Sequence, residues 1–333
     1  MNGQAGIQRG SVRFEDVRVT YAGLDRPAVD GVTFEVPAGT FVVLLGPSGC
    51  GKSTLLRTVN RLVEPQAGRI FVDGTDVQAV SATDLRRGIG YVIQAIGLFA
   101  HMSVAENIAV VPELLKWDKT RIAGRTDELL RLVHLDPQRY RDRYPRELSG
   151  GEQQRIGVAR ALAAEPRLLL MDEPFGAVDA LVRTALQEET RRIQRALGTT
   201  FLFVTHDVEE ALRIADRIVI MQDGKIVQYD EPLRILSNPA STYVAQLMET
   251  HDAVRRLSLL CVRDALEPMT DARFSTAGAH TNGVRRSIPI QATLREALTA
   301  FLDGADRVEV HDSERLAGTL TFDDIRAAMR SAR

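Results

Sequence analysis

The chain has 333 residues, enough for two or so domains and a large core. Its 42 Lys and Arg residues against 44 Asp and Glu residues give a formal net charge of −2, which offers no electrostatic case for nucleic-acid binding. Apolar runs fall short of the ~18 residues of a membrane helix, the first residues lack a signal-peptide pattern, and the two cysteines, Cys50 and Cys261, favour a reducing compartment. We therefore expect a cytosolic chain that reaches a membrane only through a partner.

The hydrophobic pattern predicts strands and helices in alternation. Residues 11–36 alternate apolar and polar, as strands with one wet face do. Residues 103–135 follow a helical period, interrupted by Pro112 and Gly124. The other predicted elements are strands at 41–45, 68–74, 168–171, 201–204 and 218–221 and helices at 152–164, 180–197 and 208–215. Continuous apolar strands between helices imply a parallel sheet covered on both faces.

One glycine-rich stretch has the form G-x-x-x-x-G-K-[ST], the phosphate-binding P-loop. It consists of Gly46, Pro47, Ser48, Gly49, Cys50, Gly51, Lys52, Ser53 and Thr54. A predicted strand precedes it and a predicted helix follows, the context that the motif requires. Backbone N–H groups and the helix N-terminus would hold a polyphosphate. Lys52 can reach the β- and γ-phosphates, and the Ser53 hydroxyl can ligate Mg²⁺.

A second candidate site lies where the strand at 168–171 ends in Asp172 and Glu173. In P-loop proteins the last Asp of such a strand reaches Mg²⁺, and Asp172 fits that role. A carboxylate at Glu173 could orient and deprotonate the attacking water. Taken alone, a solvated acidic turn explains the two acids equally well.

The sequence Leu148-Ser149-Gly150-Gly151-Glu152-Gln153 opens a predicted helix. A hydroxyl and free N–H groups at a helix N-terminus make a second phosphate site. Because the P-loop already holds one triphosphate, we expect two chains to associate head to tail. Each chain would then offer this second site to the nucleotide of the other.

These motifs, in this order, resemble the ATP-binding cassette family, the nucleotide-binding subunits of ABC transporters, over about residues 11–248. The resemblance implies that Tyr21 stacks on adenine and that Gln94 contacts Mg²⁺, water and the membrane subunit. It makes residues 149–153 the signature, with Glu152 in place of the commoner glutamine. Asp179, in the segment 176–179, would belong to the loop that crosses the dimer interface, and His206 would contact the γ-phosphate.

The resemblance also implies a fold and a mechanism. The fold is α/β: a P-loop NTPase with a RecA-like parallel-sheet core, an antiparallel β subdomain and an α-helical subdomain at about 95–160. ATP would close a homodimer and hydrolysis would open it, with ATP and Mg²⁺ as cofactors and Lys52, Gln94, Glu173 and His206 as catalytic residues. The expected metal ligands are Ser53, Gln94 and Asp172.

The stretch from Tyr91 to Trp117 resembles bacterial importers of quaternary ammonium osmoprotectants such as glycine betaine, choline and carnitine, with Ala100 where they usually have proline. The implied partners are two integral-membrane permease subunits and an extracytoplasmic solute-binding protein. The chain would lie at the cytoplasmic face of the membrane, held there by the permease. The alternatives are an importer ATPase for an amino acid or another amine and a soluble ABC protein of DNA repair or translation.

The tail resembles CBS repeats, modules attached to osmoprotectant ATPases. We expect a linker at 249–256 and a small α/β CBS-like domain at 257–333, whose first repeat, near Val262, is degenerate. Thr321 and Asp324 match a pair that holds the phosphate and ribose of an adenine nucleotide in such repeats. Since those sites form between two repeats, we favour a regulatory or dimer-stabilising tail over a high-affinity nucleotide site.

Overall fold

The computed structural model describes residues 10–23, 25–94, 97–176, 178, 180–249, 257–266, 285–305, 307–313 and 315–331. Contacts divide the chain into two compact units, Met1–Asp230 and Glu231–Arg333. The predicted end of the cassette at residue 248 falls within the second unit and stays a prediction. In the described ranges, none of the helices combines the length and apolar character needed to cross a bilayer.

The first unit is built around a six-stranded sheet with the strand order β10-β9-β3-β8-β7-β6. Its strands are β3 (Phe41–Leu45), β6 (Ile89–Val92), β7 (Leu168–Asp172), β8 (Thr200–Thr205), β9 (Arg217–Gln222) and β10 (Lys225–Asp230). All neighbouring pairs are parallel except β9 and β10, which pair antiparallel. Every residue of β3, β7 and β8 is buried, as their continuous apolar sequences predict.

A separate four-stranded antiparallel sheet forms the predicted β subdomain, in the order β2-β1-β4-β5. The strands are β1 (Val12–Val19), β2 (Val29–Val36), β4 (Ala67–Val72) and β5 (Thr75–Asp76). Phe14 and Phe34 stack with ring centroids 4.6 Å apart and share one hydrophobic core with Val42 and Leu44 of β3. This shared core fixes the antiparallel sheet against the strand that leads into the P-loop.

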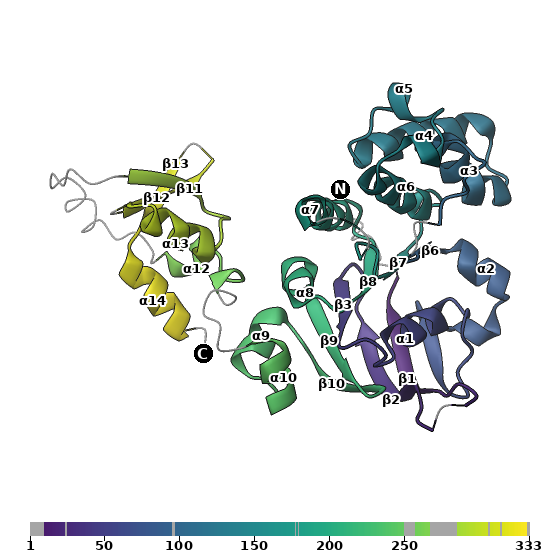
Figure 1. Cartoon of the computed structure of the whole chain (residues 1–333), viewed down its shortest axis with the longest axis horizontal. Coiled ribbons are helices and arrows are strands. Elements are labelled where there is room, and N and C mark those ends of the chain that lie inside the picture. Colours follow the sequence, from purple (N-terminus) through teal and green to yellow (C-terminus); the bar gives the residue numbers. More distant parts are fainter. Residues whose placement is uncertain are drawn as a thin grey trace, which may run out of the picture. The chain divides into compact units, whose positions relative to one another are not determined.

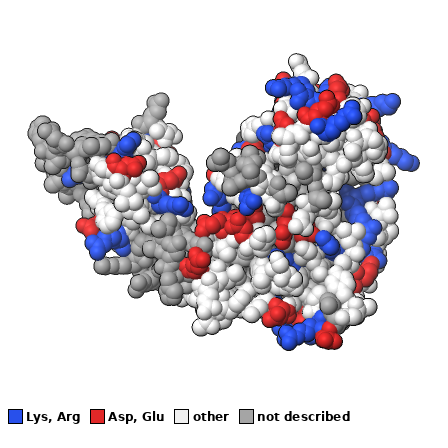
Figure 2. All heavy atoms as spheres, viewed as in Figure 1, with Lys and Arg blue, Asp and Glu red and all other residues white. Residues whose placement is uncertain are grey.

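The helices of the first unit begin mostly at Ser or Asp caps, residue types that helix N-termini favour. They are α1 (Lys52–Val59), η1 (Val77–Ala79), α2 (Ala82–Arg87), α3 (Val104–Leu114), α4 (Lys119–Leu132), α5 (Pro137–Tyr140), η2 (Pro145–Glu147), α6 (Gly150–Leu162), α7 (Ala180–Leu197) and α8 (Val208–Ile214). Figure 1 shows α3 to α6 gathered as one helical group, the predicted helical subdomain. On the face shown in Figure 2, acidic and basic side chains are interspersed over this group.

Two predicted interruptions of the helical region do not interrupt it. Pro112 lies inside α3, where it removes one backbone hydrogen bond in the last turn, and its carbonyl still accepts from Trp117 N at 3.1 Å. Gly124 lies inside α4, at a position where an added Cβ would meet no neighbour within 4 Å. Helix packing outweighs the weak local preferences of both residues.

The second unit contains a three-stranded sheet in the order β11-β12-β13, parallel between the first two strands and antiparallel between the last two. Its elements are α9 (Pro232–Ser237), α10 (Thr242–Leu247), α12 (Val262–Ala265), β11 (Arg285–Pro289), α13 (Leu294–Leu302), β12 (Arg307–Asp312), β13 (Arg315–Leu320) and α14 (Phe322–Ser331). Leu294, Val308, Val310, Leu320 and Ile325 form its core. Most of the predicted linker and residues 267–284 lie outside the described residues.

Candidate active site

The P-loop leaves the buried strand β3 and enters α1 with glycines in unusual backbone conformations. Gly51 has φ 103°, and a Cβ there would lie 2.0 Å from the Ala28 carbonyl oxygen. Gly46 has φ 156°, and its Cβ would lie 2.3 Å from the Met221 carbonyl oxygen. Only glycine fits these two places, so the loop can curl tightly at the N-terminus of α1. That curl is the geometry of an anion-binding loop.

Lys52 is the first residue of α1, and its side chain turns back along the loop. Its ammonium group donates to the carbonyl oxygens of Gly46 and Pro47 at 2.7 and 2.9 Å, and the residue is only 4% exposed. The charge therefore lies inside the loop that would hold the phosphates. Burial raises the pKa of the neighbouring Cys50 thiol, although Lys52 opposes the shift, so this cysteine is a packed side chain rather than a reactive thiolate.

The end of β7 brings Asp172 to the first turn of α1. Ser53 Oγ donates to Asp172 Oδ1 at 2.6 Å, and Arg57 Nη2 donates to Asp172 Oδ2 at 2.9 Å. The two residues expected to ligate Mg²⁺ thus lie side by side, although 119 positions separate them in the sequence. A hydroxyl and a carboxylate oxygen side by side are hard donors of the kind that Mg²⁺ binds, so these two residues fit the ion.

Arg57 is a residue of this site that the sequence did not single out. It lies one helical turn after Ser53, on the same face of α1, so both side chains reach the same carboxylate. Tyr91 on β6 also interacts with Arg57. Burial alone would lower the pKa of Arg57, but Tyr91 and the charge of Asp172 together raise it. The i, i+4 spacing from Ser53 was the one available signal.

Three more predicted residues meet at the carboxyl ends of the adjacent parallel strands β6, β7 and β8. Gln94 Nε2 lies 3.4 Å from Glu173 Oε2, and His206 Nδ1 lies 3.3 Å from the same oxygen. Glu173 has φ 44°, a strained conformation for a residue with a side chain, and its N–H donates to Val204 O at 3.1 Å. The strain aims a half-buried carboxylate at an amide and an imidazole, which suits a group that must orient and deprotonate water.

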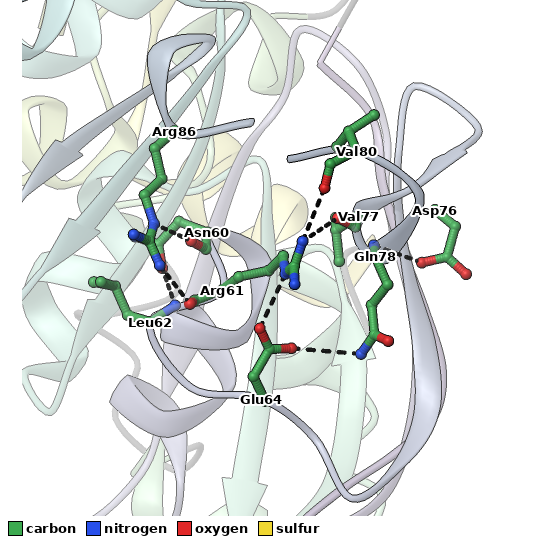
Figure 3. Close-up of polar contacts among 9 residues, drawn as sticks. All are labelled: Asn60, Arg61, Leu62, Glu64, Asp76, Val77, Gln78, Val80 and Arg86. Atoms are coloured by element: carbon green, nitrogen blue, oxygen red, sulfur yellow. Dashed lines mark hydrogen bonds and ion pairs between the residues drawn. The ribbon is translucent and has the colours of Figure 1, made fainter. Parts of the chain in front are cut away.

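A polar cluster fixes the far end of α1 (Figure 3). Arg86, at the end of α2, donates to the carbonyl oxygens of Asn60 and Arg61 at 2.9 and 2.7 Å. Arg61 in turn donates to the Val80 carbonyl at 2.8 Å and pairs with Glu64 at 3.0 Å. Asn60 is the C-cap of α1, so the contact from Arg86 satisfies a carbonyl that the helix leaves free at its C-terminus. The helix that carries Lys52 and Ser53 is therefore held at both of its ends.

The signature residues form the start of α6 in the helical group, away from α1 in Figure 1. Ser149 is the N-cap, which is why α6 begins at Gly150, two residues earlier than predicted. Its N–H donates to Glu152 Oε2 at 2.7 Å, and its hydroxyl accepts from Glu152 N at 3.3 Å, a complete capping box. Ser149 and Gly150 are exposed, and a Cβ on Gly150 would meet nothing within 4 Å. Open N–H groups at this helix start suit a phosphate from outside the subunit.

The predicted contacts of Tyr21, Gln94 and Asp179 involve a nucleotide, a metal ion or a second chain. Tyr21 is 41% exposed, and its hydroxyl lies 3.3 Å from Thr54 Oγ1, so its ring lies beside the P-loop. Its stacking on adenine remains a prediction, as does the contact of Gln94 with Mg²⁺. Asp179, predicted for the dimer interface, lies outside the described residues.

Comparisons with known proteins identify the family to which the chain is similar. Residues 29–176 match the family model described as "ABC transporter". The carnitine transport ATP-binding protein OpuCA of Listeria monocytogenes is 54% identical over 70% of this chain, and the match covers 58% of that protein. The glycine betaine/carnitine/choline transport ATP-binding protein OpuCA of Bacillus subtilis is 43% identical over 95% of this chain and 83% of its own length.

A solved structure shares the cassette fold. The post-hydrolysis dimer of the ATP-binding cassette MJ0796, bound to ADP and Pi, superposes with a TM-score of 0.59 at 29% identity. That match covers 66% of this chain and 98% of the solved chain. The similarity extends over 95% of the chain in the Bacillus relative, so it is not limited to a few short motifs. The chain belongs to the family of ABC transporter ATP-binding proteins.

Proposed function

We propose that this chain is the ATP-hydrolysing subunit of an ABC importer that takes up quaternary ammonium osmoprotectants. The observation that carries the ATPase activity is the meeting of Gln94, Glu173 and His206 beside the P-loop. The names of the relatives support the class of solute, because they describe carnitine, choline and glycine betaine transport. The match spans 58% of the length of the Listeria relative.

Each residue would have one task in hydrolysis. Lys52 and the P-loop N–H groups hold the β- and γ-phosphates, and Tyr21 stacks on the adenine. Ser53 and Asp172 would hold Mg²⁺, which when bound neutralises charge on the phosphates. Glu173 takes a proton from the attacking water while Gln94 and His206 orient the carboxylate and contact water and the γ-phosphate. No covalent intermediate is needed, because phosphoryl transfer depends on positioning and charge.

The proposed assembly is a head-to-tail homodimer beneath two permease subunits, completed by an extracytoplasmic solute-binding protein. Ser149 and Gly150 of one chain would contact the nucleotide held by Lys52 of the other. Their exposure and capping support this arrangement, because the phosphate-binding groups at the start of α6 face outward. The chain would lie at the cytoplasmic face of the inner membrane, held there by the permease.

The second unit is proposed to regulate transport. Thr321 Oγ1 donates to Asp324 Oδ2 at 2.7 Å, and Thr321 N donates to the same oxygen at 2.8 Å. The pair predicted for an adenine nucleotide thus caps α14 in this structure, which favours regulation or dimer stabilisation over tight nucleotide binding. A chain ending after residue 250 should keep basal ATPase activity and lose any response to salt or adenine-type ligands.

The deciding experiment is transport by the reconstituted complex. The chain is combined with permease and binding protein in vesicles, and uptake of labelled glycine betaine is measured with ATP inside. We expect uptake that stops in the Glu173→Gln variant. Uptake of an amino acid or another amine in place of glycine betaine would support the alternative, an importer ATPase for that solute, and would leave the ATPase assignment unchanged. No ATP hydrolysis by the wild-type chain would refute the proposal.

A further inference from the structure

The signature helix is tied to its surroundings through Tyr140. This residue ends the short helix α5 and is 9% exposed. Its hydroxyl donates to Glu152 Oε1 at 2.6 Å, while Glu152 Oε2 accepts from Ser149 N at 2.7 Å. Each carboxylate oxygen therefore has its own donor. The capping box alone would use only one of the two.

This arrangement determines what the Ser149 hydroxyl can do. Its oxygen accepts from Glu152 N at 3.3 Å, so its own hydrogen can be donated to a phosphate. The Glu152 side chain has several rotatable bonds, and holding both of its oxygens fixes its rotamer. Because Glu152 is held by Tyr140 and in turn holds the Ser149 backbone, the phenol sets the orientation of the signature serine.

Tyr140 is itself fixed by the loop that follows it. The guanidinium of Arg143 lies over its ring, 5.0 Å from the ring centroid. The carbonyl oxygens of Arg143 and Arg141 accept from Val104 N at 2.8 Å and from Ala105 N at 2.9 Å. The same loop thus holds the N-terminus of α3 and the base of the signature helix.

We propose that Tyr140 is a positioning residue for the composite ATP site, acting through Glu152 on Ser149. The inference rests on the proposed head-to-tail dimer. Tyr140 would touch neither nucleotide nor metal. Its effect should therefore appear in ATP-driven dimer closure and not in ATP binding by a single chain. The hydrogen bonds of the signature carboxylate to Tyr140 and to Ser149 N are the specific structural basis.

The negative charge of Glu152 leads to a prediction that distinguishes hydrogen bonding by Tyr140 from a role in packing alone. A hydrogen bond to a charged acceptor is about twice as strong as one between neutral groups. A glutamine introduced by Glu152→Gln could accept from Ser149 N and donate to the Tyr140 oxygen, so it keeps both contacts in a weaker, neutral form. Loss of the phenol hydroxyl should therefore cost more in a chain that retains Glu152 than in one that carries Glu152→Gln.

The test measures dimerisation in the Glu173→Gln background by analytical ultracentrifugation with Mg²⁺ and ATP. We expect Tyr140→Phe to raise the dimer Kd about tenfold, as for loss of a charged hydrogen bond, and only about threefold when Glu152→Gln is also present. The affinity of the isolated chain for a fluorescent ATP analogue should be unchanged. Tyr229→Phe is the matched control, since it removes a phenol hydrogen bond of 2.8 Å to the Glu35 carbonyl, far along the chain from the signature.

The outcomes separate the inference from the function on which it rests. If the Glu173→Gln parent forms no ATP-dependent dimer, the proposed function fails and this inference fails with it. If the parent dimerises and Tyr140→Phe leaves the Kd unchanged, or costs the same with and without Glu152→Gln, the inference alone is overturned. Should Tyr140→Phe lower the melting temperature, the difference between its cost in the Glu152 chain and its cost in the Glu152→Gln chain still decides, because the same loss of packing enters both costs.

Discussion

The contact between Arg57 and Asp172 allows a stability effect to be worked out in advance. The Asp172 side chain is 2% exposed, and its two oxygens accept from Ser53 and Arg57. Replacing Arg57 by Gln removes a charged donor and leaves a buried carboxylate oxygen less well satisfied. Hydrogen bonds to charged groups contribute about 1.5–3 kcal/mol to stability. The Arg57 side chain is 43% exposed, so solvent screening reduces this to about 1–2 kcal/mol.

Thermal and urea unfolding of the cassette measure this loss. For a domain of this size, about 1 kcal/mol shifts the melting temperature by roughly 2–4 °C, so a loss of about 1–2 kcal/mol should lower it by about 2–8 °C for Arg57→Gln. Addition of Mg²⁺ and ATP should reduce the difference, because Asp172 would gain another positive partner. Arg87→Gln serves as the control, since its pair with Asp84 is 3.5 Å long with both side chains exposed. An unchanged melting temperature for Arg57→Gln, or equal shifts for both variants, would refute the reasoning.

Three further predictions address hydrolysis, assembly and pH. Glu173→Gln should keep ATP binding and lower turnover by orders of magnitude, because the base is lost while the side-chain size is kept; near-normal turnover of the purified variant contradicts the assignment. Ser149→Arg and Lys52→Ala chains should each be inactive alone and regain one composite site when mixed, and ATP-dependent heterodimers in ultracentrifugation are the check. Burial alone would raise the pKa of Asp216, but hydrogen bonds from Arg191 and from the Phe41 N–H lower it. The stability from this group is therefore present above the unfolded pKa near 3.9 and lost as pH falls through the lower folded pKa, so Asp216→Asn should flatten that acid-side loss in urea titrations.

Most of the candidate catalytic and metal-binding residues could be predicted because each belongs to a short continuous sequence motif. Lys52 and Ser53 follow the P-loop glycines, and Asp172 and Glu173 end an apolar strand. Parallel strands place such ends on one edge of a sheet, so their convergence follows from the topology. Arg57 was not predicted because its one local signal, the i, i+4 spacing from Ser53, is too common among surface arginines on helices to mark a site. Its role depends on a carboxylate 115 positions away in sequence.

The antiparallel strand β10 and the helical positions of Pro112 and Gly124 were also beyond the local pattern. β10 has no uniformly buried face, so its period is weak, and pairing with β9 decides its conformation. Pro112 and Gly124 weaken a helix only by amounts that packing can exceed. Local sequence preference predicted the helices and strands with a strong hydrophobic period. It did not predict the conformation of segments that tertiary contacts determine.

Glu152 shows how a sequence departure can be explained by its surroundings. Among cassettes a glutamine is commoner there, and a carboxylate near a phosphate-binding helix start would by itself repel the ligand. In this chain the Glu152 carboxylate accepts from Tyr140 and from Ser149 N, and the Tyr140 hydrogen bond is the largest of the causes that lower its pKa. Both carboxylate oxygens accept hydrogen bonds from donors of the same subunit, which stabilise the negative charge. The carboxylate therefore does not occupy the place of a phosphate at the start of α6. The glutamate is therefore acceptable where a tyrosine stands beside it, and we expect replacement of Tyr140 to be tolerated less well in a chain with Glu152 than in one with Glu152→Gln.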